Sequence, residues 1–122
     1  MFGEFPGLTV DAVLLPQYQD LARAEPFATM LREQTMGSLG TPPMAPVLLA
    51  IGNADGTGDG AMVAADVRTL ATRYCDQGVP VLFQEYQGAD HLSAAALFEP
   101  ATGPYLQALL SGLPPVSNCA LL

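Results

Sequence analysis

Apolar residues change their spacing at Pro46, and this change divides the chain into two kinds of sequence. Before this point, prolines interrupt every short apolar run, at Pro6, Pro16, Pro26, Pro42 and Pro43. Pro26 suits the first turn of a helix, so the sequence predicts a helix from there to about Met36, with Gly37 as its stop. We expect residues 1–45 to be a helical cap or connecting segment.

From Pro46 onward the pattern is that of strand, loop, helix, strand and helix. Two short apolar runs, residues 46–51 and 81–86, are typical of buried strands. Between them, apolar residues recur at helical spacing over residues 62–75. A further helix is predicted over residues 92–98. Proline and glycine interrupt it before a last helical stretch, with the breaks at Pro100, Gly103 and Pro104 and the stretch at residues 105–110.

This alternation indicates an α/β fold in which the two strands are parallel and adjacent. A run as uniformly apolar as residues 46–51 belongs in the middle of a parallel sheet that is covered on both faces. Two strands are too few to bury that surface or to pair both edges. Residues 46–122 are therefore predicted to be the C-terminal β-α-β-α part of a larger α/β domain, with an incomplete sheet.

The turn after the first strand has two possible functions. Its oxygen-bearing residues fall at positions 1, 3, 5 and 12 of an EF-hand-like calcium loop, namely Asp55, Thr57, Asp59 and Asp66. Such a loop needs a helix before it and normally ends in Glu, whereas here a strand is predicted before it and the last position is Asp66. A helix at that place favours calcium, and a strand favours a catalytic acid.

An acidic residue and the only histidine of the chain follow the two predicted strands. Asp55 comes shortly after the first strand and His91 shortly after the second. Reactive groups in open α/β sheets gather where the strands end, so these two side chains are expected to meet. A carboxylate beside an imidazole fixes its tautomer and stabilises the imidazolium, as general-base catalysis requires. Each residue alone is more typical of a turn or a surface, and their order after successive strands favours catalysis.

The segments that carry chemistry resemble a known family. GNAD at the end of an apolar strand, GVPVLFQEYQGADHL and the residues Cys75 and Cys119 resemble the C-terminal portion of the secretory lipase family of α/β-hydrolases. The resemblance covers residues 46–119 well and residues 1–45 weakly, where that family has cap and connecting helices. It implies a secreted lipase or carboxylesterase of lipid catabolism that uses a Ser-His-Asp triad, no cofactor, and a lipid or other acyl ester as substrate.

The resemblance also implies roles for single residues. Asp55 would match the triad acid and His91 the triad base. Asp59 is the alternative acid, because alignment backwards from Cys75 favours it. Asp55 is expected here because the sheet should fix its offset from the strand.

The family's nucleophile lies in a G-x-S-x-G motif, which the chain lacks. Ser38 is in a near miss that has no first glycine, and the prolines after it prevent a helix. We therefore expect Ser38 to be a loop residue and the chain alone to be inactive, its partner being the missing N-terminal hydrolase segment. The alternatives are a small acidic calcium-binding module that uses residues 55–66, and a structural or interaction protein without a site.

The charge and the cysteine content of the chain limit its possible binding partners and its cellular compartment. Twelve acidic residues, four arginines and no lysine give a net charge of −8, which disfavours nucleic acid and anionic membranes. Cys75 ends a helix and Cys119 lies in a tail that must fold back, so they are predicted to form a disulfide under oxidising conditions. No segment reaches the ~18 apolar residues of a membrane span. The parent is expected to be secreted, and this chain, without a signal peptide, to be cytoplasmic with both thiols reduced.

Overall fold

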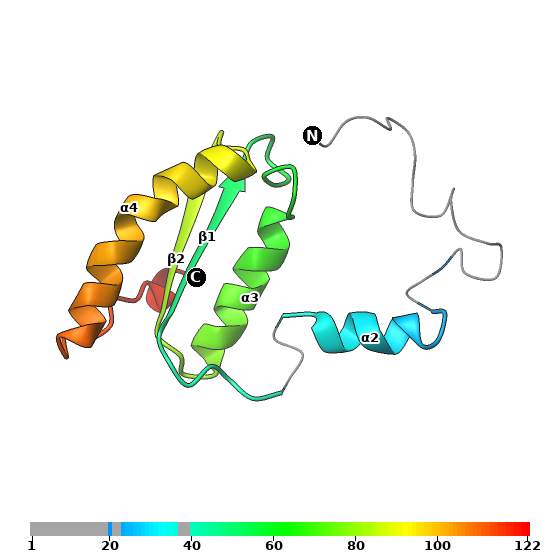
Figure 1. Cartoon of the computed structure of the whole chain (residues 1–122), viewed down its shortest axis with the longest axis horizontal. Helices are drawn as coiled ribbons and strands as arrows, with labels where there is room; N and C mark the ends of the chain where they lie inside the picture. The colour runs from blue at the N-terminus through cyan, green and yellow to red at the C-terminus, as the bar shows by residue number, and fades with distance from the viewer. Residues whose placement is uncertain (1–19, 21–22, 37–39) are drawn as a thin grey trace. The chain divides into compact units, whose positions relative to one another are not determined.

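The computed structural model describes residues 20, 23–36 and 40–122. The chain divides after Gly40 into two units, each of which is described by itself. In the first unit, helix α2 spans Phe27–Gln34 and Pro26 is its N-cap residue (Figure 1). The predicted helix therefore exists and ends slightly earlier than expected. Its predicted stop, Gly37, lies outside the described residues.

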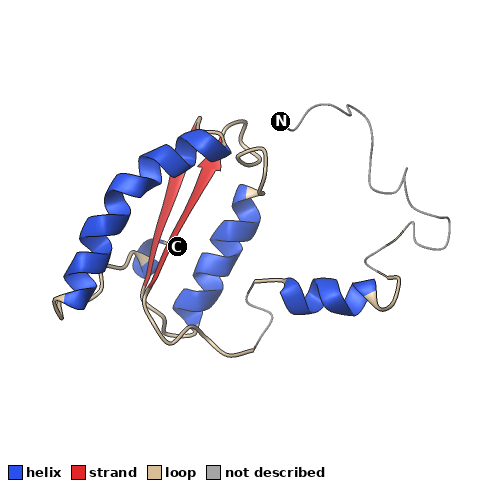
Figure 2. Ribbon diagram, in the orientation of Figure 1, coloured by secondary structure: helices blue, strands red, loops and turns tan. Residues whose placement is uncertain are grey.

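The second unit alternates strands and helices (Figure 2). In chain order its elements are β1 (Val47–Asn53), α3 (Ala64–Asp76), β2 (Val81–Gln87), α4 (His91–Leu110) and the short 3-10 helix η2 (Cys119–Leu121). The two strands are adjacent and parallel, with Val47 opposite Val81 and Asn53 opposite Gln87. The predicted parallel pair is confirmed, and the described residues form a partial α/β fold.

Helices cover both faces of the strand pair, which explains why the strands are so apolar. Figure 1 shows α3 on one side of the strands and α4 on the other. Alternate strand residues face α3, and Ile51, Val81 and Phe83 are buried there among the apolar side chains of that helix. The residues between them face α4: Ala50 and Leu82 line hollows against that helix.

Helix α4 differs from its prediction. A break at Pro100, Gly103 and Pro104 was expected, but one continuous helix contains both prolines. Each proline removes one backbone hydrogen bond and normally bends a helix, and Figure 1 shows α4 as a bent ribbon. Burial of Ala94 near its start and Tyr105 near its end holds both halves against the sheet. Tertiary packing therefore outweighs the local cost of the prolines.

The two edges of the sheet differ in whether their backbone groups are hydrogen-bonded. Val47 donates a backbone hydrogen bond to Pro80 and Gly88 donates one to Asn53, so the alternate residues Leu48 and Ala50 direct their backbone groups away from β2. Within the part of the chain that the structure describes, no strand pairs with that edge of β1.

The outer edge of β2 is covered where the strand begins. The side-chain amide of Asn118 both donates to the carbonyl of Phe83 and accepts from its N–H, at 2.8 and 2.9 Å. The backbone N–H of Asn118 donates to the carbonyl of Val81. The C-terminal tail therefore covers the start of this edge, at Val81 and Phe83, whereas no strand pairs with the β1 edge among the described residues.

A disulfide holds this tail in place. Cys75 and Cys119 are joined by a bond of 2.05 Å, with their Cα atoms 5.5 Å apart. The bond fastens η2 to the last turn of α3, beside Asn118. The predicted cysteine pair is confirmed.

The described helices include none with the length and hydropathy that a membrane crossing requires.

Candidate active site

Asp59 and His91 are in contact at the end of the strand pair. His91 is the first residue of α4, and Asp59 lies in the loop between β1 and α3. The imidazole Nδ1 is 2.7 Å from the carboxylate Oδ2, and the backbone N–H of His91 donates to the carbonyl of Asp59 at 2.9 Å. Only 1% of the Asp59 side chain is exposed, against 53% for His91. The pair thus has one buried member and one that solvent or a substrate can reach.

The loop provides Asp59 with further hydrogen bonds. Its Oδ1 accepts backbone N–H groups from Ala61 at 2.9 Å and from Met62 at 2.7 Å. Burial alone would raise the pKa of this carboxyl. The hydrogen bonds from His91, Met62 and Ala61 outweigh that effect and lower the pKa from 3.8 to about 2. Asp59 is therefore ionised at neutral pH.

An ionised Asp59 determines the tautomer of His91. A carboxylate can only accept hydrogen bonds, so a neutral imidazole must carry its proton on Nδ1, the atom that faces Oδ2. Its Nε2 is then unprotonated and can take a proton from another group. This is the tautomer that a general base needs.

Two glycines let the loops approach this closely. A Cβ on Gly52, in β1, would lie 2.4 Å from the carbonyl oxygen of Ala89 and 2.9 Å from the Cβ of Asp59. A Cβ on Gly58 would lie 2.0 Å from the carbonyl oxygen of Met62. Gly52 allows the turn before His91 to cross directly over the end of β1. This role was not predicted, and the one sign of it in the sequence is the glycine at the strand end, in GNAD.

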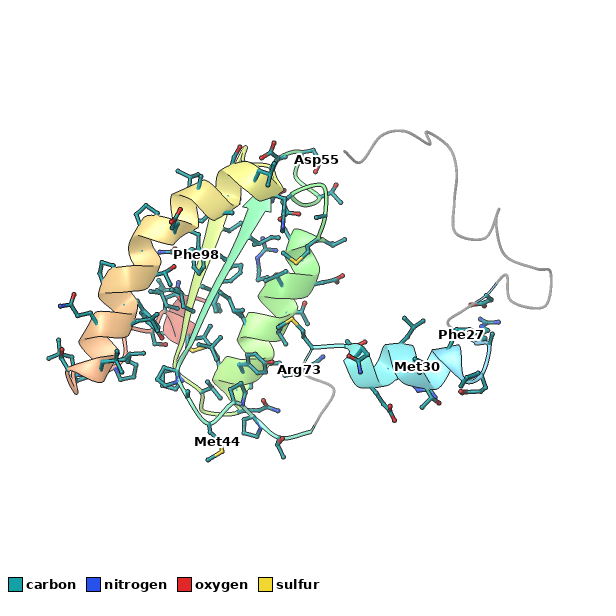
Figure 3. All side chains as sticks on the ribbon, viewed as in Figure 1. Phe27, Met30, Met44, Asp55, Arg73 and Phe98 are labelled. Atoms are coloured by element: carbon teal, nitrogen blue, oxygen red, sulfur yellow. A yellow bond between two sulfur atoms is a disulfide. The ribbon has the colours of Figure 1, made fainter. Side chains whose placement is uncertain are left out.

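Asp55 does not contact His91. Its Oδ1 accepts backbone N–H groups from Thr57 at 2.8 Å and Gly58 at 3.2 Å, and these bonds lower its pKa. The residue is exposed on the loop after β1 (Figure 3). The structure therefore corrects the expected pairing: His91 meets the alternative acid, Asp59.

The path of the loop explains why Asp59, and not Asp55, contacts His91. The backbone N–H of Ala54 donates to the carbonyl of Gly58 at 2.7 Å, so the chain turns back on itself directly after β1. Asp55 lies at the outside of this turn and Asp59 returns beneath it. The sheet fixes the end of the strand but not the offset of the acid along such a loop. Alignment backwards from Cys75 favoured Asp59, the aspartate that contacts His91.

The calcium alternative depended on the element before the loop. That element is strand β1, which favours a catalytic acid. The carboxylates of Asp55 and Asp59 are both bound to their own turns, and Asp66 lies in the first turn of α3. Across residues 20, 23–36 and 40–122, no cluster of three or more His, Cys, Asp or Glu side chains is arranged to hold a metal ion.

A small apolar cavity opens beside the pair. Its volume is about 180 Å³, and it is lined by Ala50, Ile51, Asp59, Met62, His91, Ala94, Ala95 and Phe98. Apart from Asp59 and His91, every residue of this lining is apolar. The imidazole thus lies at the border of an apolar space between β1 and the first half of α4.

The serines of the chain do not complete a triad in the described part. Ser38 lies outside the described residues. Ser93 belongs to the cap of α4, where its N–H donates to Asp90 at 2.8 Å. Ser111 follows the other end of α4, about 30 Å along the helix from His91 at 1.5 Å per residue. No hydrogen bond joins a described serine to the imidazole.

The sequence matches the family described as Secretory lipase over residues 8–118. No curated protein matches it, and no solved structure does. The matched region includes Asp59, His91 and Cys75, and it covers most of the 122 residues. The chain therefore belongs to the secretory lipase family.

Proposed function

We propose that this chain supplies the acid and the base of a serine ester hydrolase, with Asp59 as the acid and His91 as the base. The observation that carries the proposal is the 2.7 Å contact between His91 Nδ1 and a buried carboxylate whose pKa is lowered to about 2. The family supports a lipase-like function. The nucleophilic serine and the oxyanion hole would come from a hydrolase segment outside residues 46–122.

The two residues would act in both halves of the reaction. As the serine oxygen attacks the acyl carbonyl, Nε2 of His91 takes the hydroxyl proton, and Asp59 stabilises the resulting imidazolium without taking a proton itself. The imidazolium then gives its proton to the departing alcohol. A water molecule attacks the acyl-enzyme in the same way, with His91 again as base, and releases the carboxylic acid and the serine.

The shape of the second unit supports an incomplete hydrolase sheet. Among the described residues no strand pairs with Leu48 and Ala50 on the open edge of β1, and a parallel strand placed there would bond to their backbone groups. The acid and base lie where the strands end, which is where α/β sheets place their sites. We propose that residues 46–122 form the C-terminal part of an α/β-hydrolase, and that residues 1–45 are a cap or connecting segment.

The substrate class follows from the cavity and the family together. The space beside His91 is apolar, and it suits hydrocarbon better than a charged group. The proposed substrate is therefore a lipid or another acyl ester.

The test uses the protein extended by any preceding coding sequence that contains G-x-S-x-G, assayed on a chromogenic acyl ester. His91→Ala removes the base. Asp59→Asn turns an amide N–H toward Nδ1 and holds the imidazole in the wrong tautomer, for a loss on the order of 10⁴-fold in kcat. Asp55→Asn is the matched control, the same substitution in the same loop, and we expect kcat to change less than about threefold because Asp55 does not touch His91.

Two results would contradict the assignment. One is full activity in Asp59→Asn with a loss in Asp55→Asn. The other is ester hydrolysis by the 122-residue chain alone, since we expect this chain to show neither turnover nor labelling by a serine-reactive fluorophosphonate probe.

A further inference from the structure

The carboxylate of Glu85 joins three elements directly below the site. Its Oε1 accepts the side-chain amide N–H groups of Asn53 at 2.7 Å and Gln87 at 2.8 Å. Its Oε2 forms an ion pair with Arg68 of α3. Only 13% of the Glu85 side chain is exposed. The hydrogen bond from Asn53 and the contact with Arg68 lower its pKa, so it is held as the anion.

The groups that Glu85 binds are the last residues of both strands. Asn53 ends β1 and lies opposite Gln87, which ends β2. The loop to Asp59 begins at Asn53, and the turn to His91 begins at Gln87. The carbonyl of Asn53 also accepts the N–H of Gly88 at 2.9 Å. One carboxylate therefore contacts the last side chain of each strand, at the two points from which the site loops depart.

The side-chain N–H of Asn53 holds this residue against Glu85. The residue is 8% exposed, and its side-chain oxygen has no hydrogen-bond partner within the described structure. Burying an amide with one unpaired atom is costly, so an apolar residue would suit a purely structural position better. The hydrogen bond from Asn53 Nδ2 to Glu85 offsets the cost of burying this amide.

We propose that Glu85 is a positioning residue for the Asp59–His91 pair. It touches neither a substrate nor His91. It acts through its bond to Asn53, which crosses from β2 to β1 and holds the two strand ends together, and with them the 2.7 Å contact between Nδ1 and Oδ2. Its effect on catalysis rests on the function proposed above, but its effect on the contact does not.

The test reads the contact directly in the 122-residue chain. His91 is the only histidine in the sequence, so nitrogen-15 NMR of the side chain gives a single imidazole. Glu85→Gln keeps the shape of the side chain, but one amide oxygen cannot serve both Arg68 and the two strand-end amides. We expect the Nδ1 proton, protected by Asp59, to exchange with solvent at least tenfold faster. Glu99→Gln, the same substitution at an exposed position of α4, is the matched control and should change nothing.

A second variant separates positioning from a general loss of stability. Asn53→Asp places two carboxylates against each other and should disturb the contact as Glu85→Gln does. In the double variant Asn53→Asp, Glu85→Gln, the amide of residue 85 can donate to the carboxylate of residue 53, which restores the cross-strand bond with its polarity reversed. We expect the slow exchange of the Nδ1 proton to return.

The outcomes distinguish this proposal from the proposed function. Unchanged Nδ1 exchange in a folded Glu85→Gln chain would overturn the positioning role, and so would a folded double variant that stays as fast as the single ones. In the complete hydrolase, Glu85→Gln should lower kcat about tenfold with KM unchanged. Activity that survives Asp59→Asn would overturn the function proposed above and leave the NMR result standing.

Discussion

Removing the bond between Cys75 and Cys119 should cost the second unit a large part of its stability. The bond closes a loop with a sequence separation of 44. Loop-closure entropy predicts a stabilisation of about 4 kcal/mol for a loop of this length. Small domains have only about 5–15 kcal/mol in total, so the reduced chain should be marginally folded.

Urea unfolding of the oxidised and reduced chain measures this difference. We expect the midpoint to fall on reduction by the equivalent of about 4 kcal/mol, with single cooperative transitions in both states. The double variant Cys75→Ala, Cys119→Ala should unfold like the reduced chain and should not respond to reductant. A midpoint that reduction leaves unchanged would refute the argument.

The same assay tests whether the disulfide acts through the tail. With the bond intact, Asn118→Ala removes two hydrogen bonds to Phe83 and should destabilise by about 1–2 kcal/mol. If reduction releases the tail, the substitution should cost clearly less in the reduced chain. Equal costs in both states would show that the tail stays on β2 without the disulfide.

Three further outcomes follow from the site and its surroundings. The pKa of Asp59 lies near 2 instead of 3.8, so its ionised form contributes stability above pH 3.8 that is lost as the pH falls toward 2. This contribution to the free energy of unfolding amounts to at most about 2 kcal/mol. The urea midpoint of Asp59→Asn should therefore lack this part of the pH dependence. Gly52→Ala should destabilise the fold and disturb the NMR signal of His91, because the added Cβ would lie 2.4 Å from a backbone oxygen. In Gly103→Ala, within α4, the added Cβ has no atom within 4 Å among those described, and the substitution should stabilise the fold by up to about 1 kcal/mol. Tyr105→Phe should leave thermal stability unchanged or raise it, since the buried hydroxyl has no hydrogen-bond partner among the described residues.

Much of the second unit could be predicted from the sequence. Apolar runs and the crossover rule were sufficient for both strands, their parallel pairing and α3, because burial on two faces leaves a continuous apolar pattern. The continuity of α4 could not be predicted. Local rules place breaks at Pro100 and Pro104, and only the packing of Ala94 and Tyr105 against the sheet shows why the helix continues.

The site was predictable as a region but not atom by atom. The order of an aspartate and a histidine after successive strands predicted the place where Asp59 and His91 lie in contact. The choice between Asp55 and Asp59 depended on how a glycine-rich loop folds back, through a hydrogen bond between Ala54 and Gly58 that no spacing rule encodes. The network around Glu85 left no signal either, since a polar residue in a strand is equally typical of an exposed position.

The tail that covers the start of β2 also limits how copies of this chain can associate. A sheet with two open edges can add copies on both sides and grow without end, as fibres do. Here Asn118 bonds to the carbonyl of Val81 and to both backbone groups of Phe83, so among the described residues β1 offers a second copy the longer stretch of open edge. When two chains pair through their β1 strands, the β1 edge of each chain is hydrogen-bonded and can accept no further copy. Edge-to-edge association of the folded chain should therefore favour a pair over a growing array, and loss of the disulfide would weaken that preference by releasing the tail.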